Sequence, residues 1–377
     1  MTNINKTPHT HPRADTETRM DSGTGMRRDA AGNPQHDTNP SAGGMGRSAS
    51  FDVSGCETIG SLVHDLLERI DEIQQGKRDS VPTGFRDIDS AIQGLWPGQL
   101  ALIAGRPGMG ESALGLDFAR AAALRHHMPT VVFSSTMSPA ELAQRVVSAG
   151  TDIPMMTLNH GRYLDGVTDE RWNRLNGFWE MTRDAPLFIR ANVTGTAEIG
   201  EECRLLKRDH DLKLVVVDPL PTPTPTPDET APAQPGREVS KAAAALKLLA
   251  DELDVAVVST LRMDDGHEPR DDRSPRLSNL HRFGSAVRDA DVVFLVHRPE
   301  IHDPWRHPDT ADIIMAKNNN GPAMTFHLGV RDATSKFIDL PEEPEPEEPD
   351  PEEGLGSWPM TLYTANQDAK SRTTDAA

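Results

Sequence analysis

Apolar residues along the central part of the chain recur in two distinct patterns. Between residues 57 and 75 they fall three and four positions apart, with charged residues between them, which predicts a helix with one apolar face. Further along, short apolar runs such as 100–104 and 214–217 alternate with longer helical stretches. Runs of this kind predict strands buried on both faces, and their alternation with helices predicts a parallel sheet between two helical layers.

The same patterns divide the central part of the chain into defined elements. We predict strands at 129–135, 187–189, 214–218, 255–260, 290–297, 312–317 and 324–330. We predict helices at 113–125, 138–149, 168–183, 197–210 and 239–253. Ser138 precedes a proline and an early glutamate, Glu141, which is typical of a helix N-terminus. The fold class is therefore α/β, with a mostly parallel sheet and helices on both faces.

Composition separates this central part from two polar ends. Only 36% of the 377 residues are hydrophobic and 30 are prolines, so the chain is less apolar than a compact domain of its length. Residues 1–54 contain hardly any aliphatic side chains, and residues 342–353 hold eight acids and no base. Such segments bury too little apolar surface to offset the entropy of ordering, so we expect disordered tails at 1–56 and 341–377.

Charge and cysteine content exclude several classes of protein. The formal net charge of -19 argues against a surface covered in basic nucleic-acid contacts. Two cysteines, Cys56 and Cys203, make neither a disulfide framework nor a zinc spacing. The first fifty residues lack the apolar core of a signal peptide, and no apolar run approaches membrane-spanning length. We expect a cytoplasmic protein that does not contact a membrane.

A glycine-rich turn follows the apolar run 100–104 and opens into an alanine- and leucine-rich helix. The turn and the start of the helix read Gly105-Arg106-Pro107-Gly108-Met109-Gly110-Glu111-Ser112-Ala113. A strand, a turn of this spacing and a helix are the context of the phosphate-binding P-loop, G-x-x-x-x-G-K-S/T. Every position fits except the lysine, which is Glu111, so the turn predicts a nucleotide-binding fold.

Further segments match one family in the right order along the chain. They are Val81-Pro82-Thr83-Gly84-Phe85 with Gly94-Leu95-Trp96-Pro97-Gly98, the P-loop, Phe133-Ser134 with Met137-Ser138, the strand 214–218, Ala290-Asp291-Val292-Val293, and Lys317-Asn318-Asn319-Asn320-Gly321-Pro322. Together they resemble the RecA-like C-terminal domain of DnaB-type replicative helicases, superfamily 4. The resemblance covers roughly residues 61–340, and an ordered set is far more specific than a lone P-loop.

The resemblance implies an organisation and a set of ligands. Residues 57–80 resemble the linker helix that docks on the adjacent subunit of a ring, and 81–340 the RecA-like helicase domain. ATP is held by the P-loop residues named above, and Mg²⁺ by Ser112 and Asp218. The partners implied are single-stranded DNA and either a homo-oligomeric ring or co-assembly with an active helicase. The family's globular N-terminal domain is not expected, because a polar segment precedes the helix.

The catalytic positions depart from the family pattern. ATP hydrolysis needs a lysine on the phosphates, a residue that activates water and an arginine finger in trans. The resemblance places Glu111, Thr136 and Asn319 at these three positions, and Thr260 where the family usually has glutamine. A carboxylate about 4 Å from a phosphate charge costs on the order of 1–4 kcal/mol. Lys317 is retained, and we expect weakened ATP binding and reduced hydrolysis.

Basic residues for DNA contact are sparse. The loop 219–235 that follows the strand 214–218 consists of Thr-Pro repeats with two acids and no base, whereas contact with DNA phosphates requires Lys or Arg. Arg237 and Lys241 are the nearest bases and are weak candidates for nucleic-acid contact. A solvated helix face is the favoured interpretation of both.

Three functions remain open from the sequence. The first is a DnaB-like homologue with impaired or lost ATP hydrolysis, a pseudoenzyme with a structural or regulatory role. The second is an active ATP-dependent 5'-3' DNA helicase in DNA replication, since Ser112, Asp218 and Lys317 are present. The third is a non-enzymatic interaction protein that acts through its tails and the Thr-Pro loop, by extended recognition.

Overall fold

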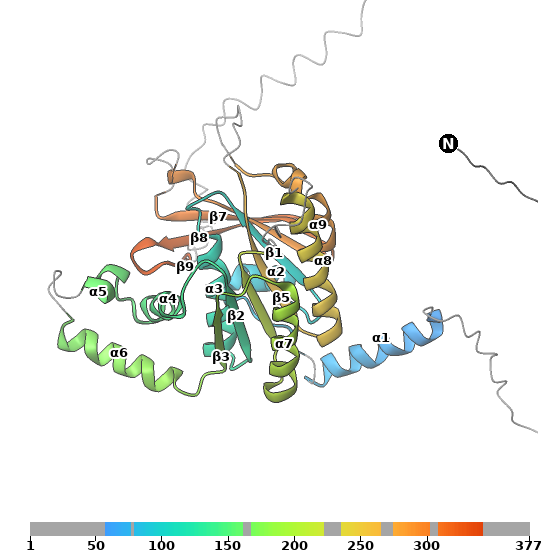
Figure 1. Cartoon of the computed structure of the whole chain (residues 1–377), viewed down its shortest axis with the longest axis horizontal. Helices are drawn as coiled ribbons and strands as arrows, with labels where there is room; N and C mark the ends of the chain where they lie inside the picture. Colours follow the sequence, from blue (N-terminus) through green and yellow to red (C-terminus); the bar gives the residue numbers. More distant parts are fainter. Residues whose placement is uncertain are drawn as a thin grey trace, which may run out of the picture. The chain divides into compact units, whose positions relative to one another are not determined.

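Within the described residues, a nine-stranded sheet forms the centre of the folded chain (Figure 1). The structure, a computed structural model, describes residues 57–76, 79–160, 167–221, 235–264, 274–301 and 308–341. In space the strand order is β3-β2-β4-β5-β1-β6-β7-β8-β9. The bounds are β1 Leu100–Gly105, β2 Thr130–Ser134, β3 Leu187–Ala191, β4 Leu214–Asp218, β5 Ala256–Arg262, β6 Val292–His297, β7 Thr310–Asn318, β8 Met324–Arg331 and β9 Lys336–Asp339.

The strands β3, β2, β4, β5, β1 and β6 pair in parallel, and all of them except the edge strand β3 are buried along most of their length. Every residue of β1 is buried. Ala101 and Ile103 belong to one hydrophobic core, whereas Leu100 and Leu102 belong to the other. Because successive side chains of a strand point to opposite faces, this alternation places one core on each side of the sheet. The predicted fold class is confirmed.

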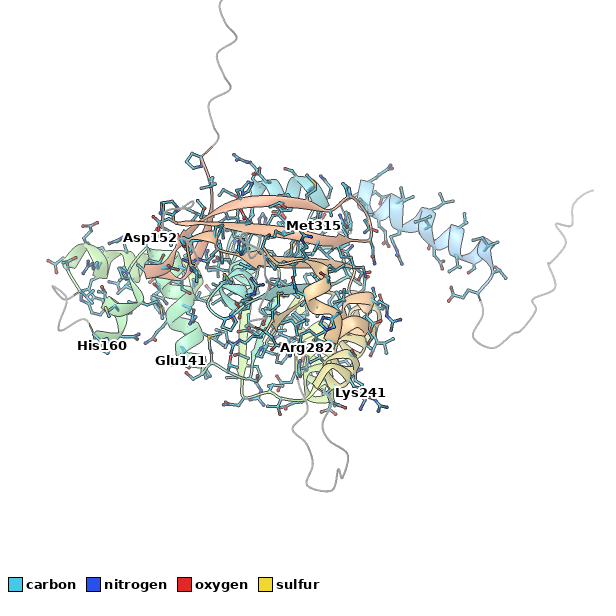
Figure 2. The ribbon with its side chains drawn as sticks, turned by 90° about the horizontal axis from the view of Figure 1, so that it is seen from above. Glu141, Asp152, His160, Lys241, Arg282 and Met315 are labelled. Atoms are coloured by element: carbon cyan, nitrogen blue, oxygen red, sulfur yellow. The ribbon has the colours of Figure 1, made fainter. Side chains whose placement is uncertain are left out.

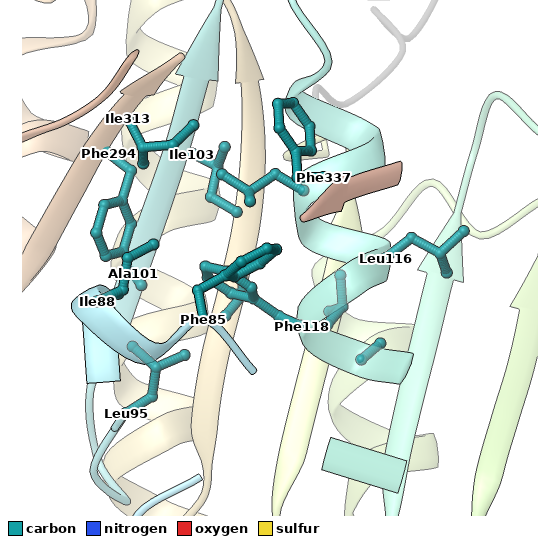
Figure 3. Close-up of a cluster of buried hydrophobic side chains, with 14 of the residues drawn as sticks. Phe85, Ile88, Leu95, Ala101, Ile103, Leu116, Phe118, Phe294, Ile313 and Phe337 are labelled. Carbon is teal, nitrogen blue, oxygen red and sulfur yellow. The ribbon is translucent and has the colours of Figure 1, made fainter. Parts of the chain in front are cut away.

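Helices supply the other half of each core. Their bounds are α1 Ile59–Gln74, α2 Arg86–Ile92, α3 Glu111–Arg120, α4 Pro139–Thr151, α5 Met155–His160, α6 Asp169–Thr182, α7 Thr196–His210, α8 Pro235–Leu253 and α9 Gly284–Asp289. On one face, α3 contributes Phe118, whose ring lies 6.0 Å from Phe85 and 6.1 Å from Phe294 (Figure 3). On the other face, Ile199 of α7 and Leu246 of α8 are fully buried.

The last three strands run antiparallel to their neighbours. The turns between them are too short for the crossover that parallel pairing requires. Sequence patterns predict β7 and β8 but not β9, whose four residues are too few to show alternation. β9 carries Phe337, which is buried against Gly110 of the P-loop. The antiparallel end of the sheet therefore helps to position the candidate site.

Most predicted elements form within a few residues of the expected bounds, and the differences are local. The predicted helix 113–125 begins earlier, at Glu111, and continues from Ala121 to Arg125 as a π-helix. The predicted N-terminus of α4 at Ser138 is confirmed, and it forms a capping box, in which Ser138 Oγ accepts from the Glu141 N–H at 3.3 Å and the Ser138 N–H donates to Glu141 Oε2 at 2.7 Å. The short helices α2, α5 and α9 were not predicted, because six or seven residues show too little periodicity.

Several predictions fall on residues outside the described part of the chain. These are the tails 1–56 and 342–377 and residues 222–234 of the Thr-Pro loop. The predicted helix at 57–75 does form, as α1, and its apolar side chains are exposed. In the part of the chain that the structure describes, no helix is long and apolar enough to cross a membrane.

Cys203 on α7 is fully buried in the core that Ile199 also joins. Burial raises the pKa of its thiol to about 12, so the reactive thiolate is scarce at neutral pH. In a Cys56→Ser variant, whose only thiol is Cys203, we expect N-ethylmaleimide to label the unfolded protein but not the folded one. Intact-mass spectrometry measures the labelling, and adding the exposed substitution Ala140→Cys gives the positive control. Rapid labelling of folded Cys56→Ser protein contradicts the prediction.

Candidate functional site

The P-loop connects β1 to α3 at the carboxyl edge of the parallel strands. Gly108 and Gly110 have φ angles of 81° and 101°, a conformation that residues with a Cβ rarely adopt. A Cβ on Gly110 would also lie 2.7 Å from the ring of Phe337. Arg106 and Met109 are buried beneath the turn, whereas Pro107 and Gly108 are exposed at its tip. The turn directs the first N–H groups of α3 toward the loop, a geometry that suits an anion.

Ser112 and Asp218, the predicted magnesium positions, lie in direct contact. Ser112 Oγ donates to Asp218 Oδ1 at 2.8 Å, and Thr260 Oγ1 donates to the same oxygen. Asp218 is 4% exposed, and among the described residues its Oδ2 has no hydrogen-bond partner. A hydroxyl and a carboxylate with an unused oxygen are ligands that Mg²⁺ takes. These residues fit a magnesium ion that also binds nucleotide phosphates.

Glu111 turns its side chain back over the P-loop. The residue is 6% exposed, and its Oε2 lies 3.2 Å from the position of a Cβ on Gly105. Its Oε1 lies 3.8 Å from Nε of Arg262 on β5. Burial raises the pKa of the Glu111 carboxyl and the charge of Asp218 adds to this, while hydrogen bonds from the backbone N–H groups of Glu111 and Gly110 and the charge of Arg262 oppose it. Two carboxylates therefore share the site.

The two substituted threonines have different environments. Thr260 is buried in β5 and binds Asp218, so it fixes the orientation of the candidate magnesium ligand. Thr136 follows β2, is exposed, and donates its backbone N–H to Ser134 Oγ at 3.3 Å. The adjacent Ser135 N–H donates to the carbonyl of Asp218 at 3.2 Å, which places this turn beside the site. A threonine hydroxyl is no general base near neutral pH.

Lys317 and Asn319 lie away from the P-loop of their own chain. Lys317 pairs across the sheet with Val293, which is paired with Leu102 of β1, roughly 10 Å along the strand before the P-loop. Asn319 lies further toward the amino edge, where its Nδ2 donates to Asp291 Oδ1 at 3.2 Å. Neither residue can reach the phosphate site of its own chain.

Lys317 binds the end of α9. Its Nζ donates to the carbonyls of Val287 at 3.0 Å, of Arg288 at 2.9 Å and of Ala290. Desolvation by burial lowers the pKa of the ammonium, so the group is held by the protein and is not freely solvated. Positive charge at a helix C-terminus is stabilising. The geometry supports a structural role for Lys317.

Replacing Lys317 with methionine is expected to lower the free energy of unfolding by about 1–3 kcal/mol, because buried carbonyls lose their donor. Urea denaturation followed by circular dichroism measures the change. Lys241→Met is the matched control, since Lys241 is exposed and makes a surface pair with Glu238, so its loss costs less than about 1 kcal/mol. Equal stability of the two variants contradicts the structural role.

A cavity of about 280 Å³ lies beside the P-loop. Three cationic side chains from distant elements line it, together with Gly108, Ser112, Ala113 and Phe337: Arg145 of α4, Arg298 after β6 and Lys336 of β9. Arg145 donates to the Ser335 hydroxyl at 2.7 Å, whereas Arg298 pairs with Asp332 and Lys336 with Asp152. No sequence motif marks these cations, because only the tertiary fold brings them to the loop. The acids Glu111 and Asp332 line the same cavity and offset part of this positive charge.

The candidate nucleic-acid residues lie on α8. Lys241 is exposed (Figure 2), and its Nζ pairs with Glu238 Oε1 at 2.9 Å. Arg237, four residues earlier, is exposed as well. The third base of this helix, Lys247, is turned inward and donates to the carbonyl of Gly98 at 2.6 Å. One of the two candidates is thus partly neutralised by a neighbour on its own helix.

Comparison with known proteins identifies the family. Residues 80–339 match the family model described as the DnaB-like helicase C terminal domain. The chain is 38% identical over 300 residues to a replicative DNA helicase DnaB of Leifsonia xyli subsp. xyli, covering 77% of this chain and 64% of that protein. It is 28% identical to the replicative DNA helicase DnaC of Bacillus subtilis, covering 76% of this chain and 63% of that one. The chain thus spans slightly less than two thirds of these relatives.

Solved structures show the same fold. The ATPase domain of G40P matches with a TM-score of 0.67 and 24% identity, over 75% of this chain and all of that one. A DnaB-like replicative helicase, solved in a study of its interactions with primase, matches with a TM-score of 0.65 and 24% identity, over 76% of this chain. The family model covers more than half of the sequence, and the P-loop, the Ser112–Asp218 contact and the sheet order lie within that part. The chain belongs to the DnaB-like helicase family.

Proposed function

We propose that this chain is a DnaB-like helicase homologue that keeps the nucleotide-binding scaffold but has impaired or lost ATP hydrolysis. The observation that carries the proposal is Glu111, a buried carboxylate at the P-loop position of the catalytic lysine. Its charge adds to that of Asp218 in one site, and phosphates bring further negative charge there. A protein of this kind has a structural or regulatory role in a helicase assembly.

Nucleotide binding is weakened in this proposal but retained. The hydroxyl of Ser112 and the unused oxygen of Asp218 are the residues that would hold Mg²⁺. The Mg²⁺ ion, when bound with ATP, neutralises phosphate charge. Arg262 offsets part of the charge of Glu111, and Arg145 lines the adjoining cavity. Binding of ATP then depends on magnesium more strongly than in a P-loop with its lysine.

The substitution at Asn319 removes the cation that the family resemblance places in trans. Asn319 is anchored at the amino edge of the sheet through its N–H, which donates to the carbonyl of Asp291 at 2.9 Å. An asparagine there can hydrogen-bond but cannot neutralise the charge that develops in the transition state. A subunit of this kind would weaken the site of its neighbour as well as its own. This property suits a regulatory subunit in a mixed ring.

Two exposed apolar surfaces support assembly into an oligomer. The helix α1 exposes a stripe of large apolar side chains that includes Leu62, Leu66 and Ile70, each 43–53% exposed. On α6, Trp172 and Trp179 are 53% and 60% exposed and fall on one face, because seven residues span two turns. Contiguous apolar surface of this kind marks protein contacts. We propose that further copies of this chain or of an active helicase cover these surfaces.

The double substitution Leu62→Asp and Leu66→Asp is expected to dissociate the oligomer. Two charges in the apolar stripe of α1 remove its tendency to bind another subunit, while no buried contact is lost. Size-exclusion chromatography with light scattering measures the mass. The control variant, Asp65→Asn with Glu68→Gln, changes charged residues between the apolar positions and should leave the mass unchanged. A monomeric parent protein contradicts the prediction.

The central test is ATP hydrolysis with and without single-stranded DNA. We expect the parent protein to show no DNA-stimulated ATP hydrolysis. When it is mixed with an active relative, we expect the rate of ATP hydrolysis by that relative to change. DNA-stimulated hydrolysis at rates typical of replicative helicases would instead establish an active 5'-3' helicase and end the proposal. A third outcome, in which nucleotide and DNA both fail to bind at millimolar concentration, favours an interaction protein that acts through its tails, 1–56 and 341–377, and its Thr-Pro loop.

A further inference from the structure

We propose that the P-loop of this protein is occupied by its own Glu111. Its carboxylate lies in the anion-binding cradle, the set of backbone N–H groups at the start of α3, and takes the place of a phosphate there. A substitution at the lysine position could in principle remove an attraction only, with the new side chain pointing into solvent. The structure shows a different arrangement, in which the carboxylate folds back onto the loop. Glu111 therefore competes with phosphates for the same donors.

Burial is the first support. A glutamate at the first position of a helix ordinarily extends into water, yet Glu111 is only 6% exposed. Its Oε2 lies against Gly105 at the start of the P-loop, 3.2 Å from where a Cβ would stand. An ionised carboxylate is rarely buried unless it is hydrogen-bonded. The protein must therefore supply donors to this group.

The candidate donors are backbone N–H groups of the cradle. Those of Gly110 and Glu111 oppose the rise in the pKa of the carboxyl that burial causes. These groups stand at the N-terminus of α3, where the helix dipole favours a negative charge. The same N–H groups are the ones that a P-loop presents to a bound phosphate.

A side-chain ion pair does not account for the position of Glu111. Arg262 Nε lies 3.8 Å from Oε1, at the long end of the range for an ion pair, and the Arg262 side chain is 70% exposed. Exposed pairs of this kind contribute little, because water screens them. The charge of Asp218 disfavours the ionised carboxylate as well. The backbone cradle is what remains to hold the carboxylate in place.

The inference rests on the proposed function and deepens it, because it says why phosphates bind weakly and not only why they fail to react. A phosphate that enters must displace a carboxylate whose effective concentration at the cradle is high. Removing the carboxylate should therefore improve anion binding even though no lysine is added. If the missing lysine were the only defect, removing the Glu111 carboxylate would not improve anion binding.

The experiment measures inorganic pyrophosphate binding by isothermal titration calorimetry at neutral pH, without nucleotide or added magnesium. Glu111→Ala removes the internal anion and Glu111→Gln keeps its shape without the charge. We expect both variants to bind pyrophosphate at least about fivefold more tightly than the parent, the lower end of the range for a charge about 4 Å away. Glu170→Gln is the matched control, since Glu170 is an exposed acid in the first turn of α6, and it should bind as the parent does.

Thermal unfolding gives a second readout that does not depend on turnover. Because the empty cradle leaves N–H groups without an acceptor, pyrophosphate should raise the melting temperature of Glu111→Ala more than that of the parent. Equal pyrophosphate affinity of parent and Glu111→Ala, or no detectable binding to either Glu111 variant, overturns the inference. Each of these results leaves the proposed function intact, because that proposal fails on parent turnover and not on variant binding.

Discussion

A variant that carries Glu111→Lys, Thr136→Glu and Asn319→Arg is expected to hydrolyse ATP in a DNA-dependent manner at least about a thousandfold faster than the parent protein. An arginine finger alone is worth about 10³ to 10⁵ in rate where it has been dissected. The remaining ligands of the site, Ser112 and Asp218, already lie in contact at 2.8 Å. Steady-state ATP hydrolysis with single-stranded DNA measures the effect.

The position of Asn319 allows a sharper form of this test. Because Asn319 lies at the amino edge of the sheet, an arginine there should act only on the site of another subunit. Glu111→Lys with Thr136→Glu gives subunits with a restored site, and Asn319→Arg alone gives subunits with a restored finger. We expect the mixture to hydrolyse ATP where neither variant does so alone. A mixture as inactive as its components would show that further positions limit turnover.

Phe118→Ala is expected to lower the free energy of unfolding by about 3–5 kcal/mol, the usual cost of truncating a buried phenylalanine. The ring is fully buried between Phe85 and Phe294 and joins α3 to β6 (Figure 3). The cavity left behind would lie beneath the helix that opens at the P-loop, so nucleotide affinity should fall together with stability. Urea denaturation monitored by circular dichroism measures the change.

Leu248→Ala is the control for this prediction. Leu248 lies on α8 and is 69% exposed, so its truncation is expected to change stability by less than about 0.5 kcal/mol. A loss below about 1 kcal/mol for Phe118→Ala would show that the core relaxes around the vacancy and that α3 is held mainly by its other contacts. Comparing the two variants separates the effect of side-chain burial on stability from the effect of placing alanine in a helix.

Much of the fold could be predicted because the signals are local. The run 100–105 is apolar without interruption, and a strand buried on both faces requires that composition. The capping box of α4 needs only Ser138 and Glu141, three residues apart. The order of segments around the P-loop predicted the family, which the match of residues 80–339 confirms. By contrast, β9 has only four residues, too few for a periodic pattern.

The sequence by itself determined the α/β fold and the P-loop with Glu111 at its lysine position, since each depends on residue types at fixed spacing, and the family resemblance added the other expected catalytic positions. Only the tertiary structure decided what those residues contact. The Glu111 carboxylate lies against Gly105 of the P-loop, Thr260 binds Asp218, and Lys317 binds the end of α9. The cavity beside the P-loop is likewise lined by residues of α4, of β9 and of the segment after β6, which are far apart in the sequence. Contacts between residues far apart in the chain arise from packing, and local periodicity carries no information about them.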